Sequence, residues 1–423
     1  MSLQLPAHAA ISGEVRIPGS KSLTNRALLL AALATRDTRL YGALDSEDTA
    51  LMRAALTQLG VPVEIAGDSL LIGGCGGALG AAGNVQTLYL GLAGTAYRPL
   101  TAALTLGEGE YVLEGSARMR ERPIAPLVDA LTTLGARIDY LESEGYPPVK
   151  VFGGGLEGGI AMLPGTLSSQ FLTSLLIAAP LAKEEVRISV PGTQVSKPYI
   201  DMTLRMMADF GVEVDRDNYT RYVVRPSRYV SPGDYEIEAD ASSASYFLAA
   251  GAIAGDSLRI VNLPANGIQG DAAFTDALRA MGASIDTDER GTIISRAGLT
   301  GVDLDLNHMP DAAMTLAITA LFATGRTRIR GISTWRIKET DRLEAMRCEL
   351  SKLGAEVKTT DNSIDITPPK QLRPARIKTY GDHRMAMCFS LASFGAPVEI
   401  EEPEVVEKTF PDYFEVFGRL VNV

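Results

Sequence analysis

The strongest constraint on this chain is a repeated pattern. Six times, a helix-like segment rich in small apolar residues begins directly after a polar or charged residue. Successive starts are about 70 residues apart, which is long enough for a complete α/β unit. The six starts are Ser20-Lys21-Ser22, Gly94-Thr95-Ala96, Ser168-Ser169-Gln170, Ser242-Ser243-Ala244, Pro310-Asp311-Ala312 and Asp382-His383-Arg384. The pattern predicts six copies of one α/β unit.

A second series of glycines has the same spacing, and each of them follows an amphipathic segment. Glycine commonly ends a helix in the left-handed conformation, and an alternating stretch such as 137–140 then predicts a strand. The glycines are Gly60, Gly135, Gly211, Gly282, Gly354 and Gly418. Each unit should therefore contain strand, helix, strand, helix and further strands.

The length of 423 residues exceeds what one hydrophobic core normally serves, so we expect two domains of three units each. The net charge of −11 argues against nucleic-acid binding and against binding to acidic membranes. Three scattered cysteines form neither a metal-binding motif nor a disulfide framework. No secretory signal or apolar stretch of about 20 residues is apparent, and we expect a cytoplasmic protein.

The two helices of each unit differ in polarity. The first ones, such as 172–179 and 314–322, are apolar nearly all round, which is typical of helices buried on every side. The second ones, such as 272–281 and 339–353, carry charge on one face. This pattern predicts helices inside each domain with sheets around them, and it gathers the starts of the buried helices at one end.

Helix N-termini attract anions, because their backbone N–H groups are unpaired and the helix dipole is positive there. Basic residues occur at the entries to the second helices, at 118–122, 338–342 and 408. Each feature also has a simpler interpretation: the serine pairs and Asp311 only cap helices, and residues 118–122 only form a solvated face. Their recurrence at equivalent points favours a shared site for a ligand with several anionic groups.

Common catalytic motifs are missing. Gly19-Ser20-Lys21-Ser22 superficially suggests a phosphate-binding P-loop, but Ser20 separates the glycine from the lysine. The chain lacks the G-x-S-x-G, H-E-x-x-H and dinucleotide-binding patterns. Metal chemistry and covalent serine chemistry are therefore poorly supported.

Seven motifs in order along the chain resemble the 5-enolpyruvylshikimate-3-phosphate synthase family. They are 18–26 (PGSKSLTNR), 94–96 (GTA), 168–172 (SSQFL), 196–201 (SKPYID), 338–342 (KETDR), 382–386 (DHRMA) and 408–411 (KTFP). The match looks closest to the bacterial enzymes that are usually inhibited by glyphosate.

The resemblance implies transfer of the enolpyruvyl group of phosphoenolpyruvate to the 5-hydroxyl of shikimate 3-phosphate, with release of phosphate. It implies an inside-out α/β barrel of six βαβαββ-type units in two domains, 1–19 with 240–423 and 20–239, joined by a two-strand hinge near 19 and 239–240. It also implies a monomer that closes over both substrates without a cofactor or metal.

The family's substrate contacts map onto matching positions here. The implied substrate-binding residues are Lys21, Ser22, Arg26, Gly94, Thr95, Arg122, Ser168, Ser169, Gln170, Ser196, Tyr199, Asp311, Thr334, Lys338, Arg342, His383, Arg384 and Lys408. Asp311 is implied as the base for the 5-hydroxyl and Glu339 as the acid that protonates the enol methylene, with Lys21 sharing the proton transfers. Leu92 and Thr334 replace asparagines that are usual in the family, which leaves glyphosate sensitivity open.

Three alternatives remain at this point. The UDP-N-acetylglucosamine enolpyruvyl transferase has the same fold but normally carries Lys-Asn near the N-terminus and a reactive loop cysteine; this chain has Lys21-Ser22, and its cysteines lie far from 118–122. A kinase using Lys21 would need ATP and magnesium. A non-catalytic anion-binding protein would bind ligand without releasing phosphate.

Overall fold

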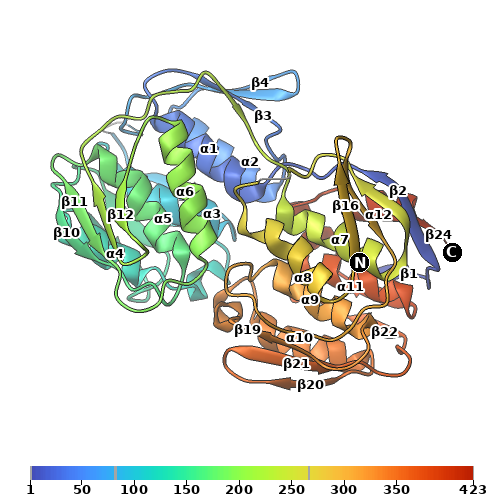
Figure 1. Cartoon of the computed structure of the whole chain (residues 1–423). Coiled ribbons are helices and arrows are strands. Elements are labelled where there is room, and N and C mark those ends of the chain that lie inside the picture. The colour runs from blue at the N-terminus through green and yellow to red at the C-terminus, as the bar shows by residue number, and fades with distance from the viewer. Residues whose placement is uncertain (1, 81–82, 265–266, 423) are drawn as a thin grey trace. The chain divides into compact units, whose positions relative to one another are not determined.

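The computed structural model describes residues 2–80, 83–264 and 267–422. The chain forms two compact units, shown in Figure 1: the first consists of Met1–Pro18 and Glu238–Val423, and the second of Gly19–Ile237. The chain therefore passes between the units twice, after Pro18 and after Ile237.

The second unit alternates strands and helices. Its helices are α1 (Lys21–Leu33), α2 (Glu47–Gln58), α3 (Gly94–Leu104), η1 (Met119–Glu121), α4 (Ala125–Thr133), α5 (Ser169–Ala178), η2 (Ala179–Leu181) and α6 (Lys197–Asp209), where η denotes a 3-10 helix. Its strands are β3 (Thr38–Tyr41), β4 (Val63–Ala66), β5 (Ser69–Ile72), β6 (Gln86–Tyr89), β7 (Glu110–Glu114), β8 (Arg137–Tyr140), β9 (Val149–Phe152), β10 (Gly159–Met162), β11 (Val186–Ser189), β12 (Asp215–Asp217), β13 (Arg221–Val224) and β14 (Asp234–Glu236).

The first unit is built in the same way. Its helices are α7 (Ala241–Ala254), η3 (Gly270–Ala273), α8 (Phe274–Ala280), α9 (Ala312–Thr319), η4 (Ala320–Phe322), η5 (Ser333–Ile337), α10 (Arg342–Lys352), α11 (His383–Ser390), η6 (Leu391–Phe394), η7 (Pro403–Lys408) and α12 (Tyr413–Leu420). Its strands are β1 (Ser2–Leu5), β2 (Ala10–Val15), β15 (Gly255–Ile260), β16 (Ser284–Asp288), β17 (Gly291–Ser295), β18 (Asp303–Asp305), β19 (Thr327–Arg330), β20 (Glu356–Thr359), β21 (Ser363–Thr367), β22 (Ala375–Ile377), β23 (Val398–Glu401) and β24 (Val421–Asn422).

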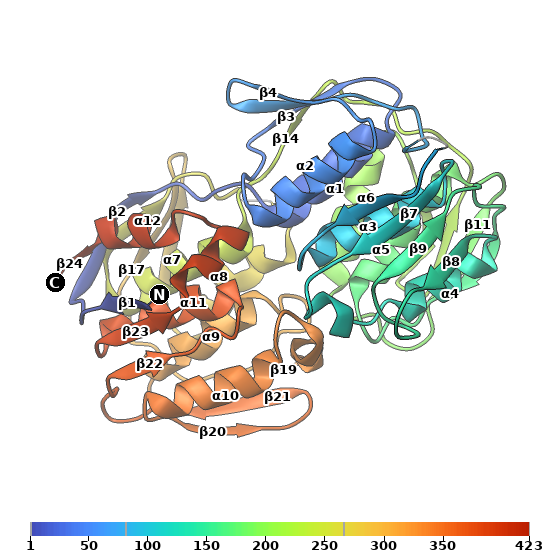
Figure 2. The same ribbon diagram turned by 180° about the vertical axis from the view of Figure 1, so that it is seen from behind.

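Four sheets share one strand order, which makes the repeat visible in the hydrogen bonding. These sheets are β6-β7-β9-β8, β10-β11-β13-β12, β18-β19-β21-β20 and β14-β3-β5-β4. In each order as written, the first two strands are parallel. The last two strands form an antiparallel hairpin, which pairs with the second strand. Figure 2 shows α4 beside β8 of its sheet. The predicted βαβαββ unit is confirmed.

Segments distant in sequence complete three copies of the unit, and one of these segments is β2, which lies parallel to β15 in the sheet β16-β17-β15-β2-β24. Strand β14, from the end of the second unit, supplies the first strand of the sheet that contains β3. In the last copy, β22 and β23 are parallel, but β1 from the N-terminus pairs antiparallel to β23 in place of a hairpin. Strands from distant parts of the sequence thus complete these sheets.

The first helix of each copy is buried, as its apolar sequence predicted. In the first unit every residue of α9 and α11 is buried, as is nearly all of α7. A narrow polar seam joins these helices: the hydroxyls of Ser245 and Thr315 are 2.8 Å apart, and Thr315 lies 3.6 Å from the sulfur of Cys388. The seam links the three helices within the core of the first unit.

Two predicted helix boundaries were wrong. The helix expected over 339–353 begins only at Arg342, because the side chain of Asp341 accepts a hydrogen bond from the Glu344 N–H (3.2 Å) and caps α10. The helix expected over 272–281 is divided into η3 (Gly270–Ala273) and α8 (Phe274–Ala280). The first correction places Arg342 in the first turn of α10.

Across the residues that the structure describes, helices long and apolar enough to cross a lipid bilayer are absent.

The close packing of α7 against the sheet provides a test of the fold. A Cβ atom at Gly251 would overlap the Cγ2 of Ile294 on β17, whereas one at Gly418 in α12 would meet nothing within 4 Å. We expect Gly251→Ala to lower the free energy of unfolding by about 1–3 kcal/mol through overpacking. Gly418→Ala is the matched control and should raise stability by about 0.5–1 kcal/mol, since alanine favours a helix. Denaturant unfolding measures both, and equal effects would contradict this packing.

Candidate functional site

The candidate site of the first unit is centred on the guanidinium of Arg342, which has 1% of its side chain exposed. It donates hydrogen bonds to three carboxylates from three elements: to Asp311 at 2.8 Å, to Glu339 at 2.9 Å and to Asp382 at 2.7 Å. Asp311 directly precedes α9, and Asp382 caps α11 through the Arg384 N–H. One arginine thus ties together the starts of α9, α10 and α11.

Arg384 forms a second bridge at the same end of the bundle. Its guanidinium donates to Asp311 at 2.9 Å and to the hydroxyl of Tyr246 on α7 at 3.1 Å. Lys338 lies 3.5 Å from the same Asp311 carboxylate. Asp311 is therefore surrounded by three cations.

These charges set the protonation of the carboxylate. Burial alone would raise the pKa of Asp311, but the positive charges of Arg384, Lys338 and Arg342 outweigh burial and hold that pKa well below its usual range. In return, Asp382, Glu339 and Asp311 raise the pKa of Arg342 despite its burial. Asp311 is ionised at neutral pH and is able to accept a proton or a hydrogen bond.

The remaining predicted residues of this unit lie on nearby elements. Lys408 is buried at the end of η7, which packs against α11. Thr334 is buried in η5, and the indole N–H of its neighbour Trp335 donates to the Pro310 carbonyl at 2.7 Å, just before Asp311. His383 is fully buried, with its Nδ1 3.4 Å from the Asp382 carboxylate.

In the second unit, the starts of α1, α3 and α5 also converge. Asn25 on α1 donates to the Thr95 hydroxyl at the start of α3, at 2.8 Å. Arg98 on α3 donates to the amide oxygen of Gln170 at the start of α5, at 2.5 Å. Lys21, in the first turn of α1, pairs with Asp48 at 3.2 Å. This end of the helix bundle therefore carries several of the predicted residues.

Arg26 is held mainly by uncharged groups. It donates to the hydroxyls of Thr203 (3.0 Å) and Thr173 (3.4 Å) and to the Ser22 carbonyl (2.9 Å). Burial is the main reason that its pKa falls to about 10, which still leaves it charged at neutral pH. Tyr199 is close enough to interact electrostatically with Arg26.

Gly94 brings the backbone close to two more arginines. A Cβ atom there would lie 2.7 Å from an Arg98 nitrogen and 3.0 Å from an Arg122 nitrogen. Arg122 is buried and donates to the Leu92 carbonyl at 3.4 Å, while Arg98 donates to the Pro123 carbonyl at 3.1 Å. Glycine at position 94 thus allows both guanidinium groups to reach the start of α3.

The predicted serines occupy helix starts. Ser168 accepts a hydrogen bond from the Gln170 N–H at 3.2 Å, so it is an N-cap, and the buried Ser169 follows it in α5. Ser196 precedes α6 and has φ of 52°, a left-handed conformation that is uncommon for serine. That conformation aims the chain into α6, where Tyr199 lies in the first turn.

Some residues of these clusters escaped the sequence analysis. Arg98 was not among the predicted site residues, although it joins α3 to α5 and lies 5.2 Å from the centre of the Phe171 ring. Asp48 was not paired with Lys21, because the two are on different helices. Asp382 was noted only as a helix start. Pairing between distant elements leaves no local sequence signal.

The acidic residues do not form a metal site. Groups of three or more His, Cys, Asp and Glu side chains placed to hold a metal ion are absent from 2–80, 83–264 and 267–422. The carboxylates of Asp311, Glu339 and Asp382 instead surround a guanidinium.

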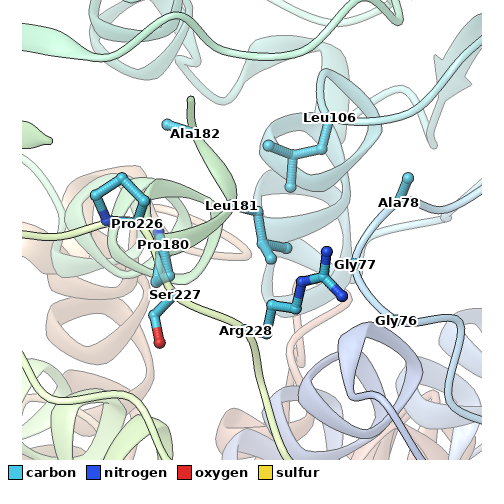
Figure 3. A pocket seen from close by; sticks show the side chains of 10 residues that line it. All are labelled: Gly76, Gly77, Ala78, Leu106, Pro180, Leu181, Ala182, Pro226, Ser227 and Arg228. Carbon is cyan, nitrogen blue, oxygen red and sulfur yellow. The ribbon is translucent and has the colours of Figure 1, made fainter. Parts of the chain in front are cut away.

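A pocket of about 540 Å³ in the second unit lies away from these helix starts. Figure 3 shows Leu106, Leu181 and Arg228 among its lining residues. Leu106 follows the C-terminal end of α3, and Leu181 lies in η2 after α5. The pocket is therefore at the opposite end of the bundle and contains no predicted site residue.

Comparison with known proteins agrees with the motifs. A sequence model of the family described as EPSP synthase (3-phosphoshikimate 1-carboxyvinyltransferase) matches residues 6–417. A 3-phosphoshikimate 1-carboxyvinyltransferase of Shewanella halifaxensis is 54% identical over 424 residues, covering 99% of each chain.

Solved structures agree as well. EPSP synthase from Acinetobacter baumannii superposes with a TM-score of 0.83 at 27% identity, over 99% of this chain and 98% of the other. The enolpyruvyl transferase NikO from Streptomyces tendae has a TM-score of 0.79 at 18% identity, over 100% of this chain and 98% of the other, and shows a shared fold only. The sequence match over nearly the whole chain is decisive: this protein belongs to the EPSP synthase (3-phosphoshikimate 1-carboxyvinyltransferase) family.

Proposed function

We propose that this protein is a 3-phosphoshikimate 1-carboxyvinyltransferase. It transfers the enolpyruvyl group of phosphoenolpyruvate to the 5-hydroxyl of shikimate 3-phosphate and releases phosphate, a step in the biosynthesis of aromatic amino acids. Both substrates carry several negative charges, which suits the basic residues at the starts of the inner helices. Membership of this family excludes the alternative that the protein is a kinase using Lys21.

The observation that carries the mechanism is that Asp311 and Glu339 contact the same buried arginine. Arg342 donates to Asp311 at 2.8 Å and to Glu339 at 2.9 Å, so both carboxyl groups are held side by side on one guanidinium. Addition of an alcohol to an enol requires removal of a proton from oxygen and delivery of a proton to carbon at nearly the same time. Two adjacent carboxyl groups can serve these two transfers.

In the proposed reaction, Asp311 accepts the proton of the 5-hydroxyl as its oxygen attacks the enol carbon. Glu339 protonates the methylene carbon, giving a tetrahedral intermediate that holds both former substrates. Removal of that methyl proton and cleavage of the C–O bond then expel phosphate and restore the enol. Lys21 shares in the proton transfers, and cations near the phosphate stabilise its departure.

Substrate contacts are proposed residue by residue. Ser22 and Arg26 bind the shikimate carboxylate, and Ser168, Ser169 and Ser196 bind its phosphate, with Gln170, Tyr199, Thr334 and Lys338 completing the contacts. For phosphoenolpyruvate, Lys21, Arg122 and Lys408 bind the phosphate, Arg342 and Arg384 bind the carboxylate, and Gly94, Thr95 and His383 lie close to it.

Further aspects of the proposal concern the whole protein. We take the two compact units as the two domains of the family, and the two chain crossings as the hinge. The protein is expected to be a cytoplasmic monomer that needs neither metal nor cofactor. Glyphosate is a candidate inhibitor, and sensitivity to it stays open because Leu92 and Thr334 replace the asparagines that are usual in the family.

The test of the function is phosphate release from phosphoenolpyruvate in the presence of a metal chelator. We expect release only when shikimate 3-phosphate is present. UDP-N-acetylglucosamine should not replace it as the acceptor. Release without an acceptor, release dependent on ATP, or binding of both substrates without release would each contradict the proposed function.

Asp311→Ala tests the proposed base. Removal of a general base typically costs about 10²–10⁴-fold, so we expect kcat to fall by that order while the KM values change much less. Steady-state phosphate release measures both constants. Asp276→Ala on the exposed face of α8 is the matched control and should leave them unchanged. Unaltered turnover in Asp311→Ala would remove Asp311 from the mechanism.

Gly94→Ala tests the placement of Arg98 and Arg122. The added methyl group would push both guanidinium groups away from the start of α3, since it would lie 2.7 and 3.0 Å from their nitrogens. We expect the KM for phosphoenolpyruvate to rise about tenfold or more, with a smaller change in kcat. Gly154→Ala meets no atom within 4 Å and serves as the control. An unchanged KM in Gly94→Ala would contradict the proposed role of Arg122.

A further inference from the structure

Asp271 is a buried carboxyl group of the first unit that the proposed mechanism does not use. It lies on η3 and is 3% exposed. One of its carboxyl oxygens accepts a hydrogen bond from the hydroxyl of Ser242 in the first turn of α7. The side chain therefore points at the same end of the inner helices as Asp311 and Arg384.

The backbone around Asp271 is fixed to the start of α7. The Gln269 side chain donates to the Ala239 carbonyl at 2.7 Å and accepts from the Ala241 N–H at 3.2 Å. The Ile268 N–H donates to the Glu238 carboxylate at about 3.1 Å. These contacts fix the chain just before Asp271 against the start of α7, where its hydrogen-bond partner Ser242 lies.

The charged groups that face Asp271 are Asp311, Arg384 and Asp240. On α8, which also packs on η3, Asp276 and Arg279 pair with each other at the surface, 3.0 Å apart. Burial is the main reason that the pKa of Asp271 rises to about 6, and the Asp311 charge adds to it; Arg384 and the Ser242 hydrogen bond act in the opposite direction.

Asp271 and Asp311 thus depend on the same arginine but differ in protonation. Arg384 contacts Asp311 directly and holds it ionised, whereas Asp271 is poised to gain a proton near neutral pH. When the pKa values of two buried carboxyl groups differ in this way, the group with the higher pKa takes up a proton first. Any anion that binds Arg384 adds negative charge close to both groups.

We propose that Asp271 is a positioning residue that takes up a proton from solvent when an anionic substrate binds Arg384, so that Asp311 stays ionised as the proton acceptor. This inference rests on the proposed function for the identity of the anion, the phosphoenolpyruvate carboxylate. The step is a simple protonation: the Asp271 carboxylate becomes a carboxylic acid, and no bond to substrate forms. Without this uptake, the added negative charge would favour protonation of Asp311 and remove the base.

The first measurement is the unfolding equilibrium as a function of pH, which requires no substrate. A carboxyl group whose pKa is higher in the folded state than in the unfolded state favours unfolding once pH exceeds the unfolded value of about 4. Asp271→Asn cannot ionise, so its stability relative to the wild type should grow as pH rises from 4 to 6 and then level off. The Asp271 pKa rises from 3.8 in the unfolded chain to about 6 in the folded protein. This difference corresponds to a gain in stability of Asp271→Asn over the wild type of roughly 100-fold in the equilibrium constant of unfolding.

Asp276→Asn on the exposed face of α8 is the matched control and should show no such pH-dependent difference. A constant difference between Asp271→Asn and the wild type would mean that Asp271 does not titrate in this range, and would overturn the proposal. The result holds whether or not the protein releases phosphate, so it separates failure of this inference from failure of the proposed function.

The second measurement is kcat/KM for phosphoenolpyruvate between pH 6 and 8. In the wild type, proton uptake makes binding weaker as pH rises; Asp271→Asn mimics the protonated form. The ratio of kcat/KM in Asp271→Asn to that in the wild type should therefore increase by up to about tenfold across this range, through KM rather than kcat. A ratio that does not change with pH would contradict the proposal.

Ser242→Ala provides a second variant in case Asp271→Asn does not fold. It keeps the carboxyl group but removes the hydrogen bond that favours the ionised form. The pH at which kcat/KM for phosphoenolpyruvate falls should then move upward relative to the wild type. An unmoved or lowered midpoint would contradict the role of Asp271.

Discussion

The buried guanidinium of Arg342 is the interaction on which the first unit's site depends. A buried charge is costly unless it is paired and hydrogen-bonded, and Arg342 meets that condition through Asp311, Glu339 and Asp382. Because the three carboxylates come from separate elements, one side chain sets the relative positions of three helix starts. The same contacts hold Asp311 and Glu339 beside each other, as a reaction that moves two protons at once requires.

The two units satisfy the hydrogen bonds of their buried arginines in different ways. In the first unit the partners of Arg342 and Arg384 include carboxylates, so its basic residues are largely balanced within the protein. In the second unit Arg26 is held by two threonine hydroxyls and a carbonyl, which satisfy its N–H groups without cancelling its charge. The second unit is thereby suited to bind anionic groups, and the first to combine anion binding with proton transfer.

The repeat and the fold class were predictable from sequence because they rest on local patterns: small apolar helices after polar starts, and glycines that end the second helices. The helix boundary at Arg342 could not be predicted, because it depends on capping by Asp341. The pairing of the N-terminal strand β1 with β23 could not be predicted either, because the two strands are far apart in sequence. Likewise, motifs indicated Asp311 and Glu339, but the ion pair of Lys21 with Asp48 and the place of Asp271 depend on tertiary contacts.

The most direct measurement of the central claim is the free energy of unfolding of Arg342→Met and of the wild type between pH 8 and pH 4. Breaking a buried ion pair typically costs about 3–5 kcal/mol because it leaves buried charge uncompensated. We expect a loss of that size at pH 8 that shrinks toward pH 4, because the buried carboxyl groups that lose Arg342 in the variant take up protons over this range. Asp311 of the wild type, whose pKa lies well below its usual range, stays ionised over the same range and keeps its stabilising contribution. A loss that is small, or that is the same at every pH, would contradict the account.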